Sequence, residues 1–195
     1  MEKIQKSSSE QDRQKSILRV RIRYLEMTHK SDPLTRVRPP RQFTVKTIHQ
    51  PEPSFYRFLY YKIGEPWLWY ERRLCSDNEL ISIIHRSDVS VNVLYSDGSP
   101  VGFFELDNRF NNEIELAYFG LLEGFIGRGL GAWLLDQALD LAWSKDPSRL
   151  WVHTCNLDHP NAIRVYERAG FVLYCEKTIE IEDPRTQPFW QTTLI

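Results

Sequence analysis

Three glycines alternate with other residues immediately before a helical pattern, in the stretch GFIGRGLGAWLLDQAL at residues 124–139. Glycine loses more conformational entropy on folding than any other residue, so the spacing of Gly127, Gly129 and Gly131 indicates a backbone with positive φ or a close approach to another group. A glycine-rich turn that opens a helix leaves N–H groups unpaired at the positive end of the helix dipole. The stretch therefore predicts an anion site, and phosphate is the first candidate ligand.

Two common phosphate-binding loops do not fit this spacing. A dinucleotide-binding loop has the pattern G-x-G-x-x-G in a strand–helix–strand unit, whereas these glycines follow G-x-G-x-G after an antiparallel hairpin pattern. A P-loop ends in G-K-[ST], whereas Gly131 is followed by Ala132 and Trp133. A third kind of phosphate loop remains, as does a glycine-rich turn without a ligand.

The composition favours one globular unit with a tail. The chain has 195 residues, of which 42% are hydrophobic, which is enough to bury one core of ordinary size. Residues 1–16 are polar and without periodicity, so we expect a flexible extension there and a single domain over residues 17–195.

The net charge of −1 conceals an uneven distribution. Up to Arg73 the chain has 16 Lys and Arg against 8 Asp and Glu, and after it 9 against 18. The basic half carries no recognised nucleic-acid motif, so we interpret it as a solvated face and expect no nucleic-acid partner. The acidic half would suit a cationic small substrate.

Cysteine usage and hydropathy bear on location. The three cysteines have no framework spacing, which favours free thiols in a reducing compartment. No apolar run is long enough to span a membrane, and the first ten residues lack the hydrophobic region of a signal peptide. These patterns predict a cytoplasmic protein without a membrane partner, and they leave a homodimer open.

Periodicity predicts a mixture of strands and helices. Residues 17–24 alternate with period two, as a strand with one buried face does, and residues 89–107 have the pattern of a hairpin around Ser-Asp-Gly-Ser. A helix is expected after Ser76 or Asp77, with Glu79 at capping-box distance from Ser76. The expected order is strands, two helices, three strands, helix, strand, helix and strand.

Two motifs together resemble the GNAT superfamily of acyl-CoA N-acyltransferases. The family's loop signature [RQ]-x-x-G-x-[GA] is matched by IGRGLG at Gly129 and Gly131, although Ile126 stands where Arg or Gln is usual. The family's pattern N-x-x-A-I-x-x-Y-E-x-x-G-F on the last helix is matched by residues 159–171, with His159 in place of Asn. The resemblance covers residues 89–177 well, and the earlier elements fit by order alone.

The resemblance implies an α+β fold with α/β/α layers, in which helices flank a mixed, mostly antiparallel central sheet. It also implies acetyl-CoA as co-substrate, no metal, and direct attack by a primary amine of a small molecule or peptide in a ternary complex. A non-catalytic acyl-CoA sensor of the same fold is the alternative. The residues expected to bind the cofactor are Phe119, Leu121, Ile126, Gly127, Arg128, Gly129, Leu130, Gly131, Asn156 and His159.

Acetyl transfer to an amine needs a base for the amine and an acid for the departing thiolate. Strand alternation places Glu113 and Glu115 on one face, opposite Ile114, Leu116 and Tyr118. By resemblance, Glu115 lies at the position of the base in glutamate-using members. Its alternative is an exposed strand carboxylate with a water chain as base, and Glu105 is the reserve candidate.

Tyr166 lies by resemblance at the position of the general acid that protonates the CoA thiolate. It shares a helix face with Ala162, Ile163 and Ala169. The alternative is a core tyrosine whose hydroxyl finds a partner.

Other chemistry is possible around residues 151–159. His153, Cys155 and His159 lack the spacing of a metal site, and a buried free cysteine is more often a small core side chain than a nucleophile. Asp158 is expected to cap the following helix. Trp67, Trp69 and Tyr70 would form either a cage for a cationic acceptor or part of the core.

Overall fold

The computed structural model describes residues 16–34 and 42–190. Its strands are β1 (Ile17–Met27), β2 (Phe43–Ile48), β3 (Val89–Ser96), β4 (Ser99–Phe110), β5 (Glu113–Leu121), β6 (Arg149–Cys155) and β7 (Val172–Glu182). Its helices are α1 (Pro53–Gly64), α2 (Glu71–Leu74), α3 (Asp77–Ile84), α4 (Leu130–Trp143) and α5 (Ala162–Arg168), with 3₁₀ turns η1 (Glu65–Trp67), η2 (Glu123–Phe125), η3 (Pro184–Thr186) and η4 (Pro188–Trp190). The expected order is confirmed, and α2 is an additional single turn. Residues 1–15 of the predicted extension lie outside the described residues.

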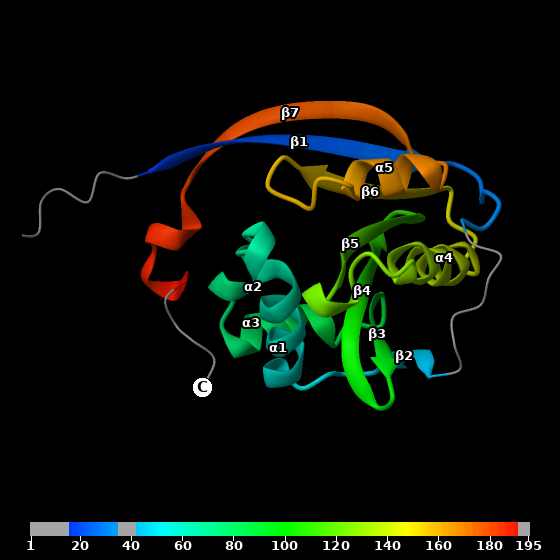
Figure 1. Ribbon diagram of the computed structural model, residues 1–195, viewed down its shortest axis with the longest axis horizontal. Helices are drawn as coiled ribbons and strands as arrows, with labels where there is room; N and C mark the ends of the chain where they lie inside the picture. The colour runs from blue at the N-terminus through cyan, green and yellow to red at the C-terminus, as the bar shows by residue number, and fades with distance from the viewer. Residues whose placement is uncertain (1–15, 35–41, 191–195) are drawn as a thin grey trace, which may run out of the picture.

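The strands form one seven-stranded sheet in the order β2-β3-β4-β5-β6-β1-β7. β5 and β6 pair in parallel, whereas the other five neighbouring pairs are antiparallel. The predicted mixed, mostly antiparallel sheet is therefore confirmed. Sequence order gave no sign that the first strand, β1, lies between β6 and β7, far from β2 (Figure 1).

Helices cover both faces of the sheet, as the α/β/α expectation requires (Figure 1). On one face, α4 and α5 bury leucines of the central strands, together with Tyr166 and Phe171. On the other face, α1 and α3 pack on β3 and β4 around Tyr56, Tyr60 and Phe103. Each face thus has its own apolar core, and the sheet separates the two.

The first turns of the helices differ in how they are capped. Ser76 and Glu79 form the expected capping box at the start of α3. Helix α5 begins at Ala162 after Asn161, which makes no side-chain cap, so the expectation that Asp158 caps this helix is wrong. Asp158 lies too far upstream and accepts hydrogen bonds within its own loop instead.

A β-bulge in β5 shapes the centre of the sheet. Glu105 of β4 lies opposite Tyr118, but the next residue of β4 lies opposite Leu116, so Ala117 is the extra residue. The bulge moves Tyr118 to the α1 face, where it packs against Tyr60, while Leu116 stays in the core under α4. The expectation from simple alternation that Tyr118 shares a face with Leu116 is therefore wrong.

β5 and β6 separate at the same place. They pair from Glu113 opposite Arg149 to Glu115 opposite Trp151, and not beyond, within the part of the chain that the structure describes. The rest of β5 keeps its partner β4 on one side and leaves its other edge open.

Within residues 16–34 and 42–190, no helix is long and apolar enough to cross a membrane.

Gly120 of β5 allows α1 to pack closely on the sheet. A Cβ atom at Gly120 would lie 2.4 Å from Cγ2 of Ile63, whose side chain is buried and has little room to move. We expect Gly120→Ala to lower the free energy of unfolding by about 1–3 kcal/mol, as measured by urea denaturation. Gly124→Ala is the matched control because an added Cβ there meets nothing within 4 Å. Equal losses in the two variants would contradict the close contact.

Candidate active site

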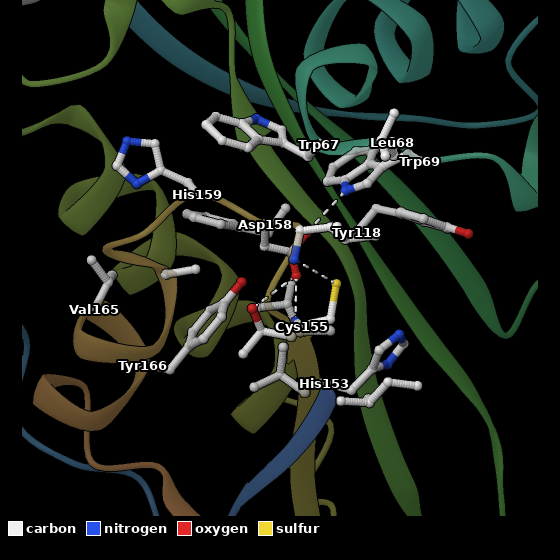
Figure 2. Close-up of a pocket in the computed structure, with 18 of the residues that line it drawn as sticks. Trp67, Leu68, Trp69, Tyr118, His153, Cys155, Asp158, His159, Val165 and Tyr166 are labelled. Carbon is white, nitrogen blue, oxygen red and sulfur yellow. Dashed lines mark hydrogen bonds between the residues drawn. The ribbon is translucent and has the colours of Figure 1, made fainter. Parts of the chain in front are cut away.

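A cavity of about 530 Å³ opens where β5 and β6 separate. Its walls come from residues 116–121 of β5, residues 152–155 of β6, the segment 67–71 between α1 and α2, and helix α5 with its preceding loop. Figure 2 shows His159 and Tyr166 on one side of this space and Tyr118 and His153 on the other. The volume is that of a small-molecule site.

The glycine loop forms one end of the cavity. Gly127 and Gly129 have φ of 80° and 77°, and an added Cβ at either would meet nothing within 4 Å. The first N–H groups of α4 have no partners within the helix, and its first turn holds no acidic residue. This arrangement is suited to an anionic group, as the sequence predicts.

Not every predicted cofactor residue faces the cavity. Six of the predicted cofactor residues line the cavity, namely Phe119, Leu121, Ile126, Gly127, Gly131 and His159. Arg128, Gly129 and Leu130 belong to the same loop without lining the cavity. The Arg128 guanidinium lies 5.4 Å from the centroid of the Phe125 ring. The open face of the loop therefore consists mainly of backbone.

Asn156 has a different role from the one expected. Its Oδ1 accepts a hydrogen bond from the backbone N–H of Arg21 at 2.8 Å, and its Nδ2 donates to the carbonyl oxygen of Arg19. The side chain thus ties the end of β6 to β1 and does not line the cavity.

Tyr166 lines the cavity from α5. Its ring packs edge-on against Phe119 and Phe171, with centroids 6.3 Å and 5.8 Å away. Burial raises the pKa of the Tyr166 hydroxyl further above its ordinary value, and Asp158 adds to this effect. The hydroxyl is therefore protonated at neutral pH and can donate a proton. The Tyr166 side chain thus belongs to the core and also borders the cavity.

Glu115 contacts His153, which lines the cavity. The Nδ1 atom of His153 lies 3.0 Å from Oε1 of Glu115, and the two side chains come from neighbouring parallel strands. The Glu115 side chain is 11% exposed and does not line the cavity, whereas that of His153 is 43% exposed and does. An ionised carboxylate only accepts hydrogen bonds, so Nδ1 carries the proton and Nε2 of the neutral ring is left with a free lone pair.

The charge of Glu115 also sets the protonation of His153. Burial lowers the pKa of the imidazole, but the hydrogen bond and negative charge of Glu115 outweigh this effect, with smaller contributions from Glu71 and Asp158. The net result is a raised pKa. The imidazole of His153 is therefore a stronger base than an ordinary histidine.

Glu105, the reserve candidate, is fully buried and already paired. Its carboxylate accepts hydrogen bonds from Arg72 at 2.7 Å and from the hydroxyl of Tyr56 at 2.5 Å. It does not line the cavity. Its place is the core between α1 and the sheet.

Asp158 joins the two sides of the cavity. One carboxylate oxygen accepts hydrogen bonds from the Thr154 hydroxyl and the Cys155 N–H, both at 2.8 Å. The other oxygen lies 3.4 Å from the indole nitrogen of Trp69 (Figure 2). The Trp67 ring lies 5.1 Å from the His159 ring. The aromatic segment before α2 is thus connected to the loop before α5.

The aromatic segment borders the cavity and also contributes to the core. Trp67, Trp69 and Tyr70 all line the cavity, and Trp69 also packs in the core under α1. Thiol chemistry finds no support at Cys155, because burial, with Asp158, raises the pKa of its thiol to about 11. Over residues 16–34 and 42–190, no group of three or more His, Cys, Asp or Glu side chains could hold a metal ion.

Comparison with known proteins places this geometry in a family. The Acetyltransferase (GNAT) family matches residues 46–171. No curated protein matches the chain in sequence.

Solved structures with the same fold share little sequence. A functionally unknown conserved protein from Staphylococcus epidermidis aligns with a TM-score of 0.63 at 17% identity, covering 86% of this chain and 63% of its own. A GCN5-related N-acetyltransferase from Sphaerobacter thermophilus has a TM-score of 0.61 at 16% identity, covering 83% and 50%. A tandem GNAT protein from the clavulanic acid biosynthesis pathway has a TM-score of 0.59 at 16% identity, covering 88% and 55%.

The chain therefore spans between half and two thirds of the length of these three proteins. At such low identity they show the fold, which agrees with the family match over most of the sheet. The chain belongs to the GNAT family of acetyltransferases.

Proposed function

We propose that this protein is an N-acetyltransferase that transfers the acetyl group of acetyl-CoA to a primary amine by direct attack in a ternary complex. The observation that carries the proposal is that one cavity is bordered by a glycine-rich helix start, a carboxylate-backed histidine and a buried tyrosine hydroxyl. These are an anion cradle, a base and an acid, which are the groups that acetyl transfer requires.

The glycine loop would hold the pyrophosphate of acetyl-CoA. Its backbone N–H groups at the start of α4 supply donors and a positive dipole end, which compensates for Ile126 in place of the family's Arg or Gln. The open edge of β5 beyond the bulge offers N–H and C=O groups to the amide-bearing arm and the thioester oxygen. His159, which lines the cavity in place of the family's Asn, is the remaining predicted contact.

His153 would be the base, and Glu115 would position it and raise its pKa. The acceptor enters as an ammonium ion and loses one proton to Nε2 of His153, which passes it to solvent. The amine nitrogen then forms a bond to the acetyl carbon, and the carbon–sulfur bond breaks with its electron pair moving to sulfur. Glu115, the predicted base, thus acts through the imidazole and is a positioning residue.

Tyr166 would donate its proton to the departing sulfur. The hydroxyl is protonated at neutral pH, as that of an ordinary tyrosine is, and the second proton lost by the nitrogen restores it. Of the two protons that the ammonium group loses, one ends on the thiol product and the other passes to solvent. No metal takes part in these steps.

The wider setting of the proposal follows from the chain as well. Three free cysteines, Cys75, Cys155 and Cys175, suit the reducing cytoplasm. The acceptor is a small molecule or peptide amine, and an aminoglycoside acetyltransferase from an uncultured soil sample shares the fold with a TM-score of 0.54 at 10% identity. Nucleic acid and membrane are not partners in this proposal, and a homodimer stays open.

Acetyl-CoA should raise the melting temperature of the protein, because a ligand that binds the native state stabilises it. We expect Tyr166→Phe to keep this rise and to lower kcat for thiol release by about 100-fold or more, since a positioned general acid contributes that much. Tyr174→Phe, at an exposed tyrosine of β7 outside the cavity, is the matched control. An unchanged kcat in Tyr166→Phe would remove the residue from the chemistry. Binding of acetyl-CoA without thiol release with any amine would favour the sensor.

The rate should depend on the protonation of His153. His153 acts as a base only when its imidazole is unprotonated. We therefore expect kcat to fall as the pH falls through the raised pKa of this group. Replacing Glu115 by Gln removes the negative charge that raises the pKa, so the acid limb of kcat should move to lower pH and the maximum should fall, measured over about pH 5.5 to 9. Glu113→Gln, on the same strand but paired with Arg149, is the control and should keep the limb. A limb at the same pH in both variants would rule out the Glu115–His153 pair.

A further inference from the structure

A two-stranded ribbon, made of residues 17–22 of β1 and 177–182 of β7, extends the sheet over the cavity. The two strands pair from Ile17 opposite Glu182 to Ile22 opposite Lys177. β6 ends beside Ile22, so the rest of the ribbon has no further strand on that side. Figure 1 shows β1 and β7 reaching together past β6. Both strands lie outside residues 46–171, where the family matches, although the solved structures of this fold align with more of the chain than that segment.

The face that the ribbon turns to the cavity is mostly apolar. Lys177, opposite Ile22 on this face, lies with its Nζ over the Tyr24 ring and does not line the cavity. Val20, Ile22, Ile179 and Ile181 line the cavity, whereas the residues that alternate with them include charged ones such as Arg19, Arg21 and Glu180. Ile179 remains 41% exposed. An exposed apolar surface inside a concave site marks a place where a ligand removes water from it.

The opposite wall is apolar too. Trp67, Leu68 and Trp69 line it, and Leu157 is a further apolar residue that lines the cavity. Leu68 has φ of 55°, a left-handed conformation that is uncommon for leucine and costs conformational energy. A bulky apolar side chain is thus held at the cavity despite an unfavourable backbone.

The charged groups of the cavity are few and of one sign. Among the described residues that line it, none is Lys or Arg, and the carboxylates are Glu71 and Asp158. Asp158 already accepts three hydrogen bonds, whereas the Glu71 carboxylate accepts one from the Tyr60 hydroxyl at 3.1 Å and lies near enough to His153 to raise its pKa. One ammonium group beside His153 and Glu71 suits this distribution.

We propose that the acceptor is a primary amine carried on an apolar body, aliphatic or aromatic, which lies between the ribbon and Trp67–Trp69 with its nitrogen at His153. The inference rests on the proposed acetyl transfer and names the class of its substrate. Polyhydroxylated amines would bury hydroxyl groups between two apolar walls without partners. Polyamines would bring further charges to a site with one accessible carboxylate, and anionic acceptors would find no Lys or Arg among the described residues that line the cavity.

Two amines of equal size test the proposal. Hexylamine and 2-(2-aminoethoxy)ethanol have the same number of heavy atoms and differ in apolar character. We expect kcat/KM to be about tenfold or more higher for hexylamine, because each apolar group that leaves water contributes to binding. Phenylethylamine should follow hexylamine, and spermidine and kanamycin should be poorer than both.

Substitutions in β7 then test whether the ribbon determines the preference for apolar amines. Ile179→Asp should raise KM for hexylamine about tenfold and change that for aminoethoxyethanol little, while the acetyl-CoA melting shift is retained. Val172→Asp is the control, because Val172 is an apolar residue of the same strand, 66% exposed, that does not line the cavity. Ile179→Thr provides a milder replacement if the aspartate variant fails to fold, with a smaller change in the same direction.

The outcomes separate the two proposals. If acetyl-CoA binds and aminoethoxyethanol, spermidine or kanamycin is preferred, the inference is overturned and acetyl transfer stands. Equal effects of the Ile179 and Val172 variants also overturn it. If acetyl-CoA does not bind, or binds with no amine acetylated, acetyl transfer itself fails and the inference fails with it.

Discussion

The separation of β5 from β6 is the constraint on which the rest of the molecule depends. Three residue pairs hold the strands together, and the extra residue Ala117 then turns β5 away. Without a neighbouring strand, the backbone groups on that edge must be satisfied by water or a ligand. Glu115 stands at the last paired position and His153 two residues beyond its partner Trp151, so this hydrogen-bonded pair lies at the point where the sheet opens. The cavity, its acid–base groups and its open backbone all follow from one local irregularity.

The two halves of the cavity have different origins in the chain. The glycine loop, the bulged strand and Tyr166 lie within the segment shared with the family, and they face the part of the site suited to an acyl donor. The ribbon lies outside that segment and faces the other part. A common donor and a variable acceptor would produce this division, since function is determined by the site and not by the fold alone. Asn156 joins the halves by bonding β6 to β1.

Local features were predictable from the sequence, and features that depend on packing were not. The glycines before α4 and the capping box of α3 are encoded within a few residues, so their conformations follow from composition and spacing. The bulge at Ala117 depends on Tyr118 finding room beside Tyr60, more than fifty positions away. Strict alternation therefore predicted the wrong face of the strand for Tyr118. Glu115 was singled out from the sequence, but its contact with His153 was not predicted, because a parallel neighbouring strand is separated by a whole helix and leaves no local signal. The position of β1 in the sheet could not be predicted for the same reason.

The place of β1 in the sheet has a consequence for how the chain reaches its native state. β1 is synthesised long before its partners β6 and β7, with Ile17 opposite Glu182. Contacts so distant in sequence slow folding, because a long loop must close before they contribute. Until then, Val20 and Leu25, which are buried in the finished protein, lie on a strand with two unpaired edges. The newly made chain must therefore keep β1 from pairing elsewhere until β6 and β7 have been synthesised.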